Sequence, residues 1–151
     1  MKGFYDITEA LRYHFESDAI VNSVTEGDIF EVDLNKQTIF PLVHVMINNA
    51  SFETNVVRFN VSLIAMDIVD ISKKATTDIF RGNSNEQDVL NTQLEVLNRA
   101  YAMMLHGNLW NDGFVVDGNP TCESFTERFE NYLAGWTMTF DVLIPNDVTI
   151  C

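Results

Sequence analysis

The stretch that most constrains the fold lies near the end of the chain, where apolar and polar residues alternate. The apolar positions are Trp136, Met138, Phe140, Val142 and Ile144, and the residues between them are Thr137, Thr139, Asp141 and Leu143. A period of two is typical of a β-strand with one face in a core. Pro145 ends the pattern, because proline has no amide hydrogen with which to continue a ladder. The sequence therefore predicts a core strand followed by a projecting C-terminal arm, residues 145–151.

Size and composition predict one globular domain over residues 1–151. The chain has 151 residues, of which 46% are hydrophobic, and it contains eleven phenylalanines. Such a chain can bury a sizeable core without the help of disulfide bonds or metal ions. No apolar run approaches the roughly 20 residues of a membrane helix, and the N-terminus lacks the apolar run of a signal peptide. Cys122 and Cys151 are too few for a disulfide scaffold. We therefore expect a soluble protein of the cytoplasm at synthesis, with two free thiols and no membrane partner.

The charge of the chain is strongly negative. Nine Lys and Arg stand against 22 Asp and Glu, which gives a formal net charge of −13. Such a surface repels the phosphates of nucleic acids at neutral pH. Sequence-specific DNA binding is therefore not expected, although a duplex can slide past an acidic wall without being held.

The first half of the chain predicts one helix followed by strands. Asp6 and Glu9 have the spacing of a capping box, and an apolar stripe on the following turns ends near Asp18. The stripe consists of Ile7, Leu11 and Phe15. A brief strand at 20–25, broken by Gly27, a strand at 42–48, a turn at 49–51 and a long strand at 55–68 are expected next. On the long strand Val57, Phe59, Val61, Leu63 and Ala65 share one face, and Arg58, Asn60 and Ser62 begin the other.

The second half predicts one long helix and the closing strands. Residues 85–106 have helical spacing, with Leu90, Leu94, Leu97 and Tyr101 expected on the face toward the sheet. A loop with Gly113, Gly118 and Pro120 around a short strand at 114–116, and strands at 124–132 and 133–144, are expected after it. Gly135 is interpreted as a bulge. Runs of strands punctuated by two helices indicate an α+β domain, with an antiparallel or mixed sheet and both helices on one face.

The sequence contains no recognisable constellation for catalysis, a cofactor or a metal. His14, His44 and His106 adjoin no nucleophile motif, and the spacing of Asp28, Glu31 and Asp33 matches no calcium loop. Asp67 and Asp70 are interpreted as surface partners of Lys73 or Lys74; Arg81-Gly82-Asn83 is a loop rather than a phosphate cradle. The aromatic residues Phe125, Phe129, Trp136 and Phe140 are expected in the core. We therefore expect a protein that is not an enzyme and that binds no cofactor or metal.

Four stretches together resemble small neck or tail-completion proteins of tailed bacteriophages, and the order of elements is similar to that of tail terminators. They are TIFPLVHVMINNASF at 38–52, SLIAMDIVD at 62–70, NEQDVLNTQLEVLNR at 85–99 and FTERFENYLAGWTMTFDVLIPND at 125–147. The resemblance implies a virion protein without catalytic residues, which forms a ring at the head–tail junction. The resemblance implies six-fold symmetry for this ring, whereas the residues themselves do not give its copy number. Such a ring caps the tail tube, contacts other neck and tail proteins and lets genomic DNA pass through its lumen.

Apolar residues outside the regular elements predict where copies meet. Segment 27–41 has no helical period, and segment 145–151 follows the last strand; both are too apolar to be left in water. The expected interface residues are Ile29, Phe30, Val32, Leu34, Phe40, Val148 and Ile150. A head-side adaptor, a tail tube subunit or a small monomeric protein-binding module would share many of these features, and folding of segment 27–41 back over its own sheet is the alternative to an interface.

Overall fold

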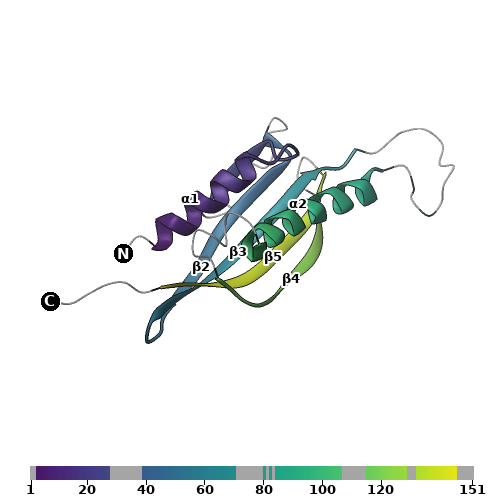
Figure 1. Cartoon of the computed structure of the whole chain (residues 1–151). Helices are drawn as coiled ribbons and strands as arrows, with labels where there is room; N and C mark the ends of the chain where they lie inside the picture. Colours follow the sequence, from purple (N-terminus) through teal and green to yellow (C-terminus); the bar gives the residue numbers. More distant parts are fainter. Residues whose placement is uncertain are drawn as a thin grey trace.

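The computed structural model describes residues 3–27, 39–70, 80, 82, 84–106, 115–128 and 132–145, with 106, 127 and 128 described by their backbone alone. It confirms an α+β fold with a mixed five-stranded sheet and two helices (Figure 1). The elements are α1 Gly3–Glu16, β1 Ser23–Glu26, β2 Leu42–Phe52, β3 Val56–Ile68, α2 Glu86–His106, β4 Val115–Arg128 and β5 Tyr132–Pro145. Most of the predicted extended loop, 27–41, and of the C-terminal arm lies outside the described residues.

The sheet has the strand order β1-β2-β3-β5-β4, in which β1 runs parallel to β2 and all other neighbours are antiparallel. Both helices cover the same face, as predicted, with α1 over β1 and β2 and α2 over β3, β5 and β4 (Figure 1). The alternating segment that was expected to be a core strand is β5, which lies between β3 and β4. Because β5 is flanked on both edges, it places its apolar face at the centre of the core.

The main core lies between the helices and one face of the sheet. On β3 and β5 the predicted alternation is confirmed, since Val61 pairs with Phe140 and Leu63 pairs with Met138, and all four are buried. The helices contribute Ile7, Leu11 and Phe15 from α1 and Val96, Leu97, Ala100 and Met104 from α2. The stripe predicted on the first helix is thus the one that α1 buries.

The predicted face of α2 is wrong by part of a turn. Leu97 is fully buried, but Leu94 is 37% exposed, and the buried side of the helix is instead formed by Val89, Gln93, Val96, Ala100 and Met104. Gln93 explains the error, because it is a polar residue in a buried position. The stripe that contains Leu90 and Leu94 is therefore more apolar in sequence than the stripe that is buried. Both amide atoms of Gln93 are buried without a hydrogen-bond partner in the described part of the chain.

The first hairpin turns later than predicted. Residues 49–51 were expected to form the turn, but they remain in β2, where Ala50 pairs with Phe59 and Ser51 with Arg58. A register shift between Ile47 and Asn49 accommodates the polar run, and the chain reverses at 53–55, where the Glu53 amide donates to the Val56 carbonyl at 2.9 Å. Residues 49–51, whose composition predicts a turn, therefore stay in the strand and follow a bulge.

The closing strands also differ from the prediction. Gly118 and Pro120 were expected in a loop, but both lie within the single strand β4, at a register shift between Asp117 and Thr121. Gly118 has a φ of +73°, which suits glycine, and proline is tolerated because β4 is an edge strand. The expected bulge at Gly135 is wrong, since its pairing with Met66 and Phe125 is regular.

A second, smaller apolar cluster lies on the face of the sheet away from the helices. It consists of the buried Phe40, Leu42, Met66 and Leu133, with Ile39, Ile64, Ile68 and Phe125 against it. The aromatic residues expected together in one core are therefore divided: Trp136 and Phe140 face the helices, Phe125 faces the other way, and Phe129 lies outside the described residues. Side-chain alternation along β4 and β5 produces this division.

Candidate functional site

A network of polar side chains crosses the face of the sheet opposite the helices. Asn48 of β2 donates to Asn60 and to Ser62 of β3, at 2.8 Å in each case. The hydroxyls of Ser62 and Thr139 lie 3.2 Å apart, and Asn60 donates to Asp141 of β5 at 2.9 Å. In this network, which we call the polar ladder, cross-strand pairs satisfy the polar side chains on this face of β3.

Arg58 joins the polar ladder to the edge strand. Its guanidinium donates to Glu53 at 3.0 Å, to Asp141 at 3.3 Å and to Asp117 of β4. The hydrogen bonds to Asp117 and Glu53 raise the pKa of Arg58 above its already high ordinary value. A permanently charged group thus holds the hairpin, β5 and β4 together at the end of the sheet near 53–58.

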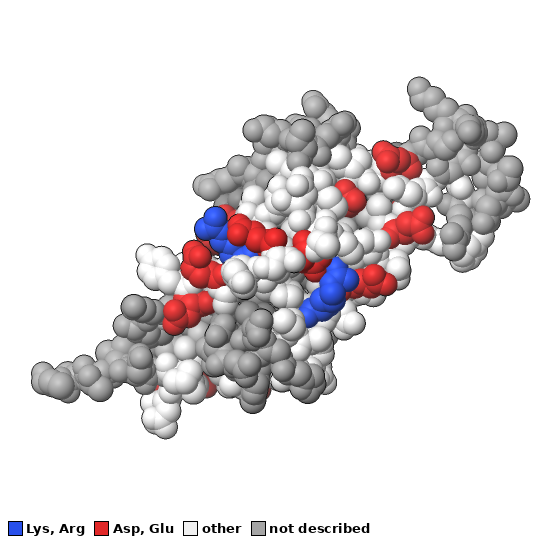
Figure 2. All heavy atoms as spheres, turned by 45° about the horizontal axis from the view of Figure 1, so that its top comes forward, with Lys and Arg blue, Asp and Glu red and all other residues white. Residues whose placement is uncertain are grey.

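Every Lys or Arg side chain that the structure describes is engaged by a carboxylate of the same chain. Arg12 lies 2.9 Å from Glu16 on α1, Arg58 has the partners above, and Arg99 lies 2.9 Å from Asp18. Figure 2 shows the same relation on one face of the molecule, where blue groups adjoin red ones and further red groups have no blue neighbour. Among the described side chains there is therefore no unpaired Lys or Arg to bind a phosphate.

Asp18 and Arg99 tie the end of α1 to α2 with two hydrogen bonds, at 2.9 and 3.0 Å. Burial raises the pKa of the Asp18 carboxyl, but the hydrogen bonds from Arg99 and from the Ile20 amide outweigh it, so the net shift is downward. Nearby His14 has a buried Nε2 without a partner among the described residues. Burial lowers the pKa of His14, and the charge of Arg99 adds to this against the opposing effect of Asp18.

Stability is expected to fall as the pH drops below the ordinary histidine pKa of about 6.5. Because the folded pKa of His14 is lowered, the unfolded chain binds the proton more readily there, and stability decreases with falling pH until the folded pKa is passed. The contribution of Asp18, whose folded pKa is lowered, is lost only at more acidic pH, as the pH falls from the ordinary carboxyl pKa toward the folded one. Denaturation of the wild type and of His14→Gln at pH 7.5 and 5.0 measures this effect. The variant should lose less stability between the two pH values, and an equal loss would contradict the assignment.

The remaining candidates from the sequence have structural roles or lie outside the described part. His44 is fully buried, with Nδ1 2.6 Å from the Thr25 hydroxyl and Nε2 2.8 Å from the Gly27 carbonyl oxygen. Because a carbonyl oxygen only accepts, Nε2 is the donor. Burial raises the pKa of Asp67. The His106 side chain, the acidic residues of 28–33 and Lys73, Lys74, Arg81 and Asn83 lie outside the described side chains.

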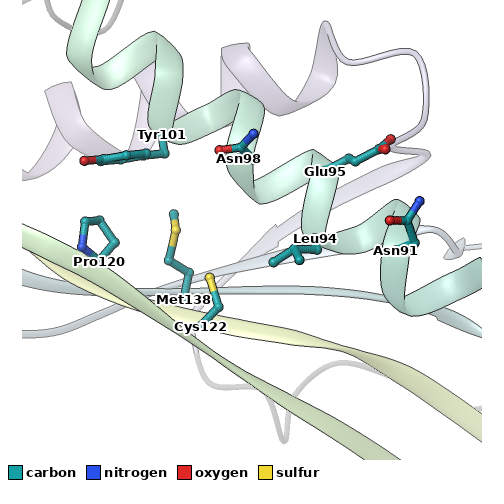
Figure 3. Close-up of a pocket in the computed structure, with 8 residues that line it drawn as sticks. All are labelled: Asn91, Leu94, Glu95, Asn98, Tyr101, Pro120, Cys122 and Met138. Atoms are coloured by element: carbon teal, nitrogen blue, oxygen red, sulfur yellow. The ribbon is translucent and has the colours of Figure 1, made fainter. Parts of the chain in front are cut away.

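A groove between α2 and the strands was not predicted from the sequence. It has a volume of about 340 Å³ and is lined by Asn91, Leu94, Glu95, Asn98 and Tyr101 of α2, Pro120 and Cys122 of β4, and Met138 of β5. Figure 3 shows Tyr101 over Pro120 and Leu94 beside Cys122 and Met138, with Asn91, Glu95 and Asn98 along the same helix. We call it the α2–β4 groove. Its signal in the sequence was the Leu94–Tyr101 pair, which had been assigned to the core.

The floor of the α2–β4 groove holds a free thiol. Cys122 makes no disulfide, and burial raises its pKa, so the thiol is protonated at neutral pH. No histidine lines the groove, and its single carboxylate, Glu95, lies on the exposed side of α2. An uncharged thiol without a base beside it is a weak nucleophile, so the groove suits binding rather than chemistry.

The predicted interface residues are only partly placed. Ile29, Phe30, Val32, Leu34, Val148 and Ile150 lie outside the described residues. Phe40, which was grouped with them, is only 7% exposed and belongs to the second apolar cluster of its own chain. Large apolar side chains are exposed elsewhere, among them Phe52 beside the hairpin turn and Tyr5 and Tyr13 on α1.

Within the described ranges no three His, Cys, Asp or Glu side chains gather as a metal site would require, and neither helix has the length and apolar character needed to span a membrane. The sequence matches no protein-family model, and no curated protein is similar enough to count as a relative.

Proposed function

We propose that this chain is a structural virion protein of a tailed bacteriophage, which forms a homo-oligomeric ring at the head–tail junction, caps the tail tube and joins it to the neck. The resemblance of four sequence stretches to neck and tail-completion proteins supplies the location. The ring would have six-fold symmetry, contact other neck and tail proteins and reside in the virion after assembly in the host cytoplasm. The protein performs no catalysis in this role.

The observation that carries the proposal is that, among the described residues, the sheet ends in two unlike edge strands. One edge is the short β1, which runs parallel to its neighbour, and the other is the long antiparallel β4. Within the described residues no strand pairs with the outer side of β4. When such unlike surfaces pair between copies, the contact is head to tail, and head-to-tail contacts form a ring where the rotation from copy to copy closes.

Size-exclusion chromatography with light scattering tests this proposal. A ring of several copies is the expected result, and a monomer at micromolar concentration would favour a small protein-binding module instead. A ring alone is shared by a head-side adaptor and a tail tube subunit. A reconstruction of the virion distinguishes these three stations, because a terminator contacts the last ring of the tube whereas a tube subunit is repeated along it.

The predicted interface segment gives a matched pair of substitutions. Phe30→Asp is expected to abolish the ring while leaving the melting temperature unchanged, because the sequence predicts that Phe30 contacts a neighbouring copy. Phe40→Asp should unfold the chain, because Phe40 is buried in its own apolar cluster. Circular dichroism and light scattering on both variants provide the measurement. Loss of fold in Phe30→Asp would instead show that segment 27–41 covers its own sheet.

Duplex DNA is expected to bind the protein only weakly. The net charge is −13, and each described Arg is already paired with a carboxylate, so few phosphates can be neutralised. Fluorescence anisotropy with a labelled duplex in physiological salt should show no binding at micromolar protein. Micromolar or tighter affinity that weakens steeply with added salt would contradict a lumen through which DNA passes unhindered.

A further inference from the structure

The α2–β4 groove is apolar at its floor and open to solvent along α2. Leu94, although apolar, is 37% exposed there, and it lies beside Cys122 of β4 and Met138 of β5 (Figure 3). An apolar groove that is open to solvent beside a packed core can accept an apolar segment of another chain. The groove therefore has the composition of a docking site for a short apolar segment.

The upper rim of the groove offers hydrogen bonds with a spacing suited to an extended backbone. Asn91 and Asn98 are exposed, and neither side chain makes a hydrogen bond within the described part of the chain. They are seven residues apart on α2, about 10.5 Å along the helix axis at 1.5 Å per residue. Three residues of an extended strand span about 10 Å, so two amides at this distance can each pair with one backbone group of the same segment.

Residues 146–151, reading NDVTIC, have the pattern that such a groove accepts. Val148 and Ile150 alternate with polar residues, so an extended conformation places both on one side, about 6.7 Å apart. Pro120 and Cys122, which line the floor, are likewise two residues apart on one strand. The apolar side chains of the segment thus match the spacing of the floor while its backbone remains accessible to the two asparagines.

The segment falls short of the Met138 end of the groove in its own chain. It follows Pro145, whereas the floor of the groove lies at Met138, seven residues back along β5 and about 23 Å away at 3.3 Å per residue. Val148 and Ile150 follow Pro145 by three and five residues, so they reach at most about 11 and 18 Å from it. The chain would also have to reverse direction first. The segment of another copy is not subject to either restriction.

We propose that the α2–β4 groove of one copy binds residues 146–151 of a second copy. The inference rests on the proposed ring function and names the surface through which successive copies are joined. Groove and segment are different parts of the chain, so the contact is head to tail, and each copy gives its segment to one neighbour and receives that of the other. Cys151 of one copy then lies near Cys122 of the next.

Disulfide trapping tests the arrangement directly, because the chain contains only these two cysteines. The ring is treated with diamide at pH 8, where the Cys122 thiol ionises more readily, and is analysed on a denaturing gel without reductant. Diamide takes up the two electrons and two protons that two thiols lose on forming a disulfide. The wild type should give a ladder of dimers, trimers and larger species. Cys122→Ser and Cys151→Ser should each give monomers alone, whereas rings assembled from both variants together should give dimers and nothing larger.

Contact between the same cysteine of two copies would produce a different result from contact between Cys122 and Cys151. A dimer formed by either single-cysteine variant alone, or a monomer with an internal disulfide, would overturn the proposal. Substitutions in the segment provide a test without cysteine chemistry. Val148→Asp should raise the protein concentration needed for half-assembly by about tenfold or more, since an apolar contact is lost. Thr149→Asp adds the same charge at the next position and should have a much smaller effect.

Deletion of residues 146–151 separates this inference from the function on which it rests. The shortened chain should melt like the wild type, because β5 remains complete, but should fail to form the ring. A wild-type protein that is monomeric would remove the proposed function itself. A ring that forms equally well without the segment, and that gives no disulfide ladder when intact, would overturn the groove assignment and leave the ring proposal standing.

Discussion

Replacing Gly135 by alanine is expected to cost about 3 kcal/mol or more of folding stability, because overpacking against a backbone cannot be relieved by a rotamer change. A Cβ at this position would lie 1.9 Å from the Ala65 carbonyl oxygen and 2.9 Å from the Met66 Cα. Both atoms belong to β3, which is paired along its length with β5. Since whole domains are stable by only about 5–15 kcal/mol, the variant should unfold at a much lower denaturant concentration.

Gly118→Ala is the matched control for this prediction. The added Cβ meets no atom within 4 Å, but the residue has a φ of +73°, so the expected loss is the backbone strain of about 1–2 kcal/mol. Urea denaturation followed by circular dichroism measures both variants. Equal losses at the two positions would show that close approach of β3 is not what requires glycine at Gly135.

Leu97→Ala is the second substitution with a large expected effect. Leu97 is fully buried among core residues from α1, α2 and the sheet, and truncation of a buried leucine costs about 2–5 kcal/mol. Leu94→Ala, one turn earlier on the same helix, should cost about 1 kcal/mol or less, since Leu94 lines the open groove. Chemical denaturation of both variants provides the comparison, and the opposite order of effects would contradict the orientation of α2.

The two leucines also show that sequence periodicity predicts the bounds of a helix better than its buried face. The bounds of α2 agree with the prediction to within a residue, because helical spacing and the terminal signals are local. The orientation of the helix was missed because Gln93 interrupts the truly buried stripe. Spacings of three and four residues fit two overlapping stripes on one helix, and only the packing against the sheet selects between them.

Two segments with the composition of turns were wrongly predicted to lie outside the strands, for a related reason. Asn49-Ala50-Ser51 and the pair Gly118 and Pro120 are typical of loops, yet both segments are held in strands by long neighbours that extend past them. Local preference is weaker than a continuous ladder, and the mismatch is absorbed as a register shift. The predicted alternation of β3 and β5 succeeded because burial on one face enforces it at each position.

The groove and the Arg58 cluster could not be predicted from single segments. Tyr101 and Pro120, or Arg58 and Asp141, are brought together only by the strand order in which β5 inserts between β3 and β4. A sequence pattern records neighbours along the chain, whereas these contacts depend on which strands become neighbours across the sheet. The candidate site is for this reason a result of topology.

The internal pairing of Arg12, Arg58 and Arg99 has a consequence for how free copies behave in solution. Copies with a net charge of −13 repel one another, over a screening length of about 30 Å at 0.01 M salt but only about 3 Å at 1 M. Encounters between copies should therefore become more frequent as salt is added, which is the reverse of the behaviour of a nucleic-acid-binding protein. In the proposed assembly, this repulsion would disfavour association until counterions screen it or another surface brings the copies together.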